Sequence, residues 1–85
     1  MRLRSRMEAV LANRFATLDS AALAAGNTPS AIVAPWSDAA GTPDRVVVNI
    51  YRYNGTAPVA TDTGLLRVKA SIEGSALALD TLAAR

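Results

Sequence analysis

The chain has 85 residues, enough for a single domain (residues 1–85), and its nine Lys and Arg against seven Asp and Glu give a net charge of +2. The absence of cysteine and histidine excludes disulfides, thiolate metal sites and catalysis by a cysteine nucleophile or a histidine base. A small domain buries only about 60 to 65% of its unfolded surface, yet 51% of these residues are hydrophobic. We therefore expect other chains to cover part of the apolar surface.

No apolar run approaches the roughly 20 residues that a membrane-spanning helix requires, so no membrane partner is predicted. Glu8, Asn13 and Arg14 interrupt the apolar residues that follow the N-terminal arginines, and this pattern does not predict a secretory signal. We expect a protein made in the cytoplasm. The preference for Ala and Arg over Lys indicates a bacterial or phage source.

The first predicted element is an amphipathic helix from Arg2 to about Leu18. Asp19 or Ser20 is the predicted cap of a second, short helical turn over residues 21–25. Gly26 and Asn27 predict a left-handed helix end before Pro29. The long helix is predicted from apolar residues that recur every three or four positions, namely Leu3, Met7, Val10, Leu11, Phe15 and Leu18.

Three strands are predicted next. The short run 30–34 ends at Pro35, which cannot donate to a ladder and is typical of an edge strand. Residues 45–53 are the richest in β-branched and aromatic side chains and predict the central strand. Residues 65–73 alternate apolar with polar side chains, as a half-buried strand antiparallel to the central one does.

The end of the chain is predicted as a short helix that Ser75 caps and that runs to Arg85, although the alternation of Leu77 and Leu79 leaves a strand open. The predicted fold class is α+β: a small antiparallel sheet of about three strands flanked by an N-terminal amphipathic helix and a short C-terminal helix. Its predicted core consists of Met7, Leu11, Phe15, Val46, Val48, Ile50, Leu66, Val68 and Ile72.

The connection of residues 54–64 is longer than a hairpin needs, although Asn54-Gly55 is a strong turn sequence. Its glycines and Pro58 leave it little capacity to pack on itself, so we expect a mobile loop. Pro58 and Val59 give it an apolar tip, which predicts an interface with another chain.

Two further groups of residues are candidate contact sites. Arg2, Arg4 and Arg6 precede the first acid and have the charge to contact phosphate, although most short runs of this kind are solvated helix starts. Tyr51 and Tyr53 have the spacing of a stacking platform for single-stranded nucleic acid, but two tyrosines on one strand face more often pack at an interface or under a helix.

Asp38, Asp44 and Asp62 all fall in predicted connections. Three carboxylates suggest a metal or acid–base site, but their spacing matches no calcium loop, and loop aspartates usually cap turns through their own backbone. No catalytic residue, cofactor or metal site is predicted.

The order of a helix from Met7, a strand ending in Ala34-Pro35-Trp36, and the strand within residues 43–51 resembles the start of phage and contractile-particle tail-terminator and tail-completion proteins. Residues 48–54 carry most of the resemblance. It implies a homo-oligomeric ring that caps the tail tube and joins it to the head, without catalysis. The partners that it implies are other virion proteins, and the location is the virion, assembled in the cytoplasm of a bacterial host.

We therefore expect a non-enzymatic, self-associating structural protein of a phage or phage-like particle. An alternative hypothesis is a small nucleic-acid-binding module that uses Arg2, Arg4, Arg6 and the face of Tyr51 and Tyr53. A third is an enzyme subunit whose site is completed by a partner.

Overall fold

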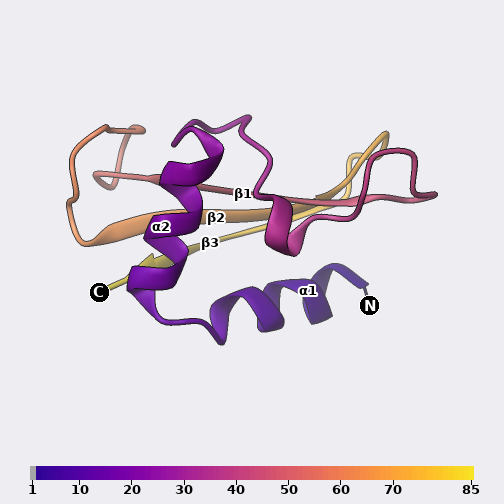
Figure 1. Cartoon of the computed structure of the whole chain (residues 1–85), viewed down its shortest axis with the longest axis horizontal. Helices are drawn as coiled ribbons and strands as arrows, with labels where there is room; N and C mark the ends of the chain where they lie inside the picture. Colours follow the sequence, from indigo (N-terminus) through magenta and orange to yellow (C-terminus); the bar gives the residue numbers. More distant parts are fainter. Residues whose placement is uncertain (1) are drawn as a thin grey trace.

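The computed structural model describes residues 2–85, which form two N-terminal helices followed by a three-stranded antiparallel sheet (Figure 1). The predicted α+β class is confirmed. In Figure 1 the strands run along the long axis, α1 runs beside them and α2 crosses them. The elements are α1 (Arg2–Leu11), α2 (Phe15–Ala25), the 3-10 turn η1 (Ala34–Trp36), β1 (Val46–Arg52), β2 (Leu65–Ile72) and β3 (Ala78–Ala84).

The predicted long helix is two helices, because the chain breaks at residues 12–14. The Asn13 side chain donates to the carbonyls of Ala9 and Val10 at 3.1 and 3.0 Å and so competes with the next helical turn. Arg14 is extended, and α2 begins immediately after it, so the cap predicted at Asp19 or Ser20 is wrong. The left-handed end of α2 is confirmed, with φ of 116° at Gly26 and 53° at Asn27.

The predicted C-terminal helix is absent from the described residues, and β3 takes its place. β3 pairs with β2 so that Val68 lies opposite Thr81, while β1 pairs with the other edge of β2 so that Val48 lies opposite Ala70. Side chains alternate along β3 between half-buried and exposed. The Ala and Leu content of this stretch favours a helix, but pairing with β2 overrides that intrinsic propensity.

Both helices pack on one face of the sheet, against alternate residues of β1 and β2. Most of the predicted core is confirmed, although Phe15 and Ile72 are only partly buried. Leu11 is exposed, because it is the last residue of α1 and lies beside the buried stripe of Leu3, Met7 and Val10. None of the described helices is long and apolar enough to cross a membrane.

The strand predicted over residues 30–34 is wrong, and the chain instead follows the outer edge of β1 irregularly. The Val33 and Asp38 N–H groups donate to the carbonyls of Val48 and Val46 at 2.8 and 2.9 Å. Side-chain oxygens accept the N–H groups of β1, with Asp38 bonded to Val46 at 3.0 Å and Ser37 to Val48 at 2.8 Å. Farther along β1, the Asn27 side chain accepts the Arg52 N–H at 2.8 Å. Among the outward residues of β1 in the described chain, only Ile50 lacks such a partner, so this edge is closed to a further strand.

Residues 54–64 are held by local hydrogen bonds that were not predicted from the sequence. The Asn54 side chain accepts the N–H groups of Thr56 and Ala57 at 2.9 and 2.8 Å. Farther on, Asp62 forms an ion pair with Arg85, and Figure 1 shows this connection and the C-terminus at the same end of the molecule. The bonds of Asn54 correct the expectation that this segment packs little on itself for the turn at residues 54–57, while most of its side chains are exposed as expected.

Candidate interaction surface

The face of the sheet opposite the helices has two unlike halves. On β1 its side chains are Val47, Asn49 and Tyr51, and all of them are buried. Asn49 donates to the Ala31 carbonyl at 2.7 Å, which shows that the segment before η1 lies over this part of the face. On β3 the corresponding side chains, Asp80 among them, are exposed. The half of this face nearest β3 is therefore the accessible one.

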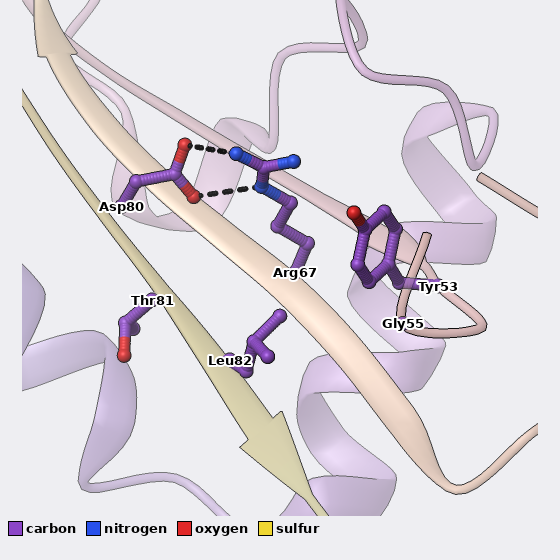
Figure 2. A pocket seen from close by; sticks show the side chains of 6 residues that line it. All are labelled: Tyr53, Gly55, Arg67, Asp80, Thr81 and Leu82. Atoms are coloured by element: carbon purple, nitrogen blue, oxygen red, sulfur yellow. Dashed lines mark hydrogen bonds and ion pairs between the residues drawn. The ribbon is translucent and has the colours of Figure 1, made fainter. Parts of the chain in front are cut away.

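At the centre of the accessible half, Arg67 of β2 binds both carboxylate oxygens of Asp80 on β3 at 3.0 and 2.9 Å. Figure 2 shows the guanidinium lying between Asp80 and the Tyr53 ring, whose centroid is 5.3 Å from the guanidinium carbon. The hydrogen bond to Asp80 raises the pKa of Arg67 above its ordinary value. The two charges compensate each other, so the cluster offers no free charge to an anion.

These side chains line a shallow hollow of about 300 Å³ that is open to solvent. This volume is at the lower end of the range for ligand pockets, which enclose most of a ligand's surface. The hollow is lined by Tyr53, Gly55, Arg67, Asp80, Thr81 and Leu82 (Figure 2). Because β3 lies at the edge of the sheet, the hollow opens next to that edge.

The outer edge of β3 lacks the covering that closes β1. The Ile72 N–H donates to the Leu77 carbonyl at 3.2 Å and the Arg85 N–H to the Gly64 carbonyl at 2.9 Å. By the alternation of an antiparallel ladder, Leu79, Thr81 and Ala83 then pair with β2. The backbone groups that point away from the sheet belong to Ala78, Asp80, Leu82 and Ala84.

Within residues 2–85, no hydrogen bond reaches these outward backbone groups. Natural edge strands are usually protected by charged side chains, proline or a bulge. β3 has no proline or bulge, and its one charged residue, Asp80, is paired with Arg67. Leu77 and Leu82 at this edge are 54% and 52% exposed. The edge is thus open, mostly apolar and seven residues long.

The three N-terminal arginines all have acidic partners on the chain. Arg6 donates to the Trp36 carbonyl at 2.7 Å and pairs with Asp38 at 3.0 Å. Arg2 lies 3.4 Å from the same carboxylate, and Arg4 pairs with Glu8 at 3.2 Å. Arg2 and Arg6 therefore attach α1 to the segment that closes β1.

The other predicted contact residues gather near the hairpin connection. Tyr53 forms a bridge with Pro58 and an edge-to-face contact with Tyr51 at 6.2 Å between ring centroids. Tyr51 is only 7% exposed, and Val59 is half-buried with its N–H bonded to the Arg52 carbonyl at 3.0 Å. In Figure 1 this connection lies at the opposite end of the molecule from the N-terminus. The structure therefore does not bring the tyrosines and the N-terminal arginines together.

The edge of β3 was not among the predicted contact sites. The alternation of Leu77 and Leu79 was the feature of the sequence that pointed to it. The predicted loop aspartates are dispersed, since Asp38 pairs with arginines of α1 and Asp62 with Arg85. In the described part of the chain, no three His, Cys, Asp or Glu side chains are grouped so as to hold a metal ion.

Protonation of the Asp38 and Asp62 carboxylates should determine how the stability of the fold depends on pH. The Val46 N–H and the Arg6 guanidinium bind its carboxylate and hold its pKa below the ordinary 3.8. Arg85 and the Gly64 N–H lower the pKa of Asp62 in the same way. A group whose pKa is lowered on folding stabilises the fold above its unfolded pKa, and this contribution is lost as the pH falls through its folded pKa.

We expect the melting temperature to be constant from about pH 8 to about pH 5 and to fall below about pH 4. Circular dichroism melts across this range measure it. The variant Asp38→Asn, which has no charge to lose, should start from a lower melting temperature and show a smaller acid-induced decrease. A transition midpoint near pH 6.5 would contradict this assignment, since the chain contains no histidine.

No protein-family model, curated protein or solved structure matches this chain. The function is therefore inferred from the open edge, the closed edge and the positions of the charged residues.

Proposed function

We propose that this protein is a non-enzymatic structural subunit that associates with copies of itself, in the role that its resemblance to tail-terminator and tail-completion proteins of phage particles implies. The observation that carries this proposal is the open edge of β3. Unpaired N–H and C=O groups on a flat edge form a template for another strand. Protein–protein contact is the use that such an edge serves best.

Exposed leucines support the same function. In a chain of 8.8 kDa, each large apolar side chain left in water forgoes about 1.5 to 3 kcal/mol of burial free energy. Leu77 and Leu82 flank the open edge, whereas Leu11 and Leu23 lie exposed on the two helices. Leu82 coincides with unpaired backbone groups, and Leu77 directly precedes β3, so this edge has both apolar and hydrogen-bonding contacts to offer.

Nucleic-acid binding is less well supported by the geometry. A stacking platform needs exposed aromatic rings beside free cations, but Tyr51 is buried and Arg67 is neutralised by Asp80. Arg2 and Arg6 share the carboxylate of Asp38 at the far end of the molecule. No single described surface combines the two groups of residues.

Static light scattering over a wide concentration range, with and without single-stranded DNA, tests the proposal. We expect the mass to rise above the 8.8 kDa of one chain as concentration increases and to be unchanged by DNA. A chain that is monomeric at every concentration would contradict the proposal, and a monomer that binds DNA would support the alternative.

Two leucines of similar exposure make a matched pair of variants, since Leu23 on α2 is 47% exposed and Leu82 on β3 is 52% exposed. Leu82→Ser should weaken association, whereas Leu23→Ser should leave it unchanged. Equal weakening by both substitutions would mean that association is nonspecific apolar clustering.

A further inference from the structure

We propose that two copies of this chain pair antiparallel through β3, with Thr81 of each copy on the twofold axis, so that their sheets join into one continuous sheet with three strands from each copy. This inference rests on the proposed function, because it names the contact through which the copies associate.

The closed edge of β1 limits which partner strand a second copy can offer. Asp38, Ser37 and Asn27 already occupy the outward N–H groups of Val46, Val48 and Arg52. The outward carbonyls of the same residues accept from Val33, Asp38 and Val59. A second copy can therefore continue the sheet only with its own β3. Two identical edges that meet in this way are related by a twofold axis.

The positions of the outward groups select the register. Ala78, Asp80, Leu82 and Ala84 are arranged symmetrically about Thr81. With Thr81 opposite Thr81 of the second copy, Ala78 lies opposite Ala84 and Asp80 lies opposite Leu82. Every outward N–H and C=O group of β3 then has a partner in an antiparallel ladder.

The neighbouring registers are less favourable. A shift that centres the pair on Asp80 places two carboxylates directly opposite each other, which destabilises strand pairing. A shift that centres it on Leu82 leaves Ala78 opposite no residue of β3. Full overlap and the absence of opposed like charges occur together only with Thr81 on the axis.

Side chains agree with this register on both faces. Asp80 keeps its two hydrogen bonds to Arg67, so no unpaired carboxylate is brought against Leu82 of the second copy. On the helix-facing side, Leu79 comes opposite Ala83 of the second copy, and both residues already pack against the core. On this face the apolar pairs of Leu79 and Ala83 therefore flank a pair of Thr81 side chains at the axis.

Comparing Leu82→Pro with Leu82→Ala distinguishes the contribution of backbone pairing at this edge from that of the leucine side chain. The Leu82 N–H points away from β2, so Leu82→Pro removes an outward donor and places a ring at the edge without breaking the ladder within the chain. Leu82→Ala removes the same side chain but keeps the N–H. We expect a dimer dissociation constant at least about tenfold higher for Leu82→Pro than for Leu82→Ala. Circular dichroism should show the same fold for both, and equal dissociation constants would overturn the proposal.

Cysteine cross-linking tests the register, and no other disulfide can form because the natural chain has no cysteine. Directly opposed residues of a non-hydrogen-bonded antiparallel pair have Cα atoms about 4.5 Å apart, within the range of a disulfide. Mild oxidation of the Thr81→Cys variant should cross-link most of the protein. Leu82→Cys, which faces Asp80 in this register, and Ser75→Cys, in the exposed turn before β3, should cross-link much less. Cross-linking of either control to the level of Thr81→Cys would overturn the register.

The two proposals fail in different ways. If the unmodified chain associates but neither the proline nor the cysteine result is obtained, association uses another surface and only the pairing through β3 is refuted. If the unmodified chain stays monomeric at all concentrations, the proposed function itself is refuted.

Discussion

Val48→Asp should leave the chain unfolded. Val48 lies in the middle of β1, is fully buried between the sheet and the helices, and has Ala70 opposite it on β2. No cation reaches this position, so the new carboxylate would be buried without a partner at a cost of several kcal/mol. A domain of this size has a margin of about 5 kcal/mol, and the substitution removes most or all of it.

Far-UV circular dichroism and urea denaturation measure this outcome. Ala16→Asp is the matched control, because it adds the same group at an exposed position in the first turn of α2, where a negative charge is favourable. The control should fold as the parent does. If Val48→Asp melted at the parent's temperature, the assignment of this face of β1 to the core would be wrong.

Arg52→Gln should cause the second largest loss of stability. The Arg52 guanidinium binds both carboxylate oxygens of Asp19 at 2.8 and 2.9 Å and donates to the Ala60 carbonyl at 2.9 Å. One side chain therefore joins β1 to α2 and to the connection of residues 54–64. The Arg52 and Asp19 side chains are only 16% and 14% exposed, so glutamine would leave a shielded carboxylate without its cation.

Arg4→Gln provides the comparison, because the pair of Arg4 and Glu8 is 79% and 68% exposed and spans one helical turn. Such exposed pairs contribute about 0.5 kcal/mol or less. The decrease in melting temperature should be clearly larger for Arg52→Gln than for Arg4→Gln, and Asp19→Asn combined with Arg52→Gln should recover part of it. Equal decreases for the two arginine variants would show that the shielded pair stabilises no more than an exposed one.

Strands β1 and β2 were predictable from sequence to within about one residue at each end, because their side chains alternate strongly or are dense in β-branched residues. The stretch that forms β3 was not, since its alanines and leucines satisfy helical spacing as well as alternation. Only pairing with β2 decides between the two. The break at Asn13 was missed for a related reason: apolar spacing continues across it, while the side-chain bonds that end α1 are local.

The candidate surface could likewise be predicted from sequence only in part. Tyr53 and Pro58 were predicted to contact another chain, which stays a prediction, and the structure adds a bridge between the two residues within the chain. The pair of Arg67 and Asp80 was not predictable, because Asp80 was assigned to a helix and so could not be placed opposite β2. The closure of β1 by Ser37 and Asp38 depends on a tertiary path that local sequence does not specify.

That closure also sets a limit on growth. Uncontrolled aggregation of β proteins requires each added molecule to present a fresh edge to the next. Here the side chains of Asn27, Ser37 and Asp38 occupy one rim of the sheet, so joining two molecules through β3 consumes the exposed rim of both. Edge-to-edge pairing through backbone hydrogen bonds then stops at two molecules, and this route does not lead to fibrils. With the pairing proposed above, a larger particle would be built from such pairs through side-chain surfaces, and its number of chains would be even.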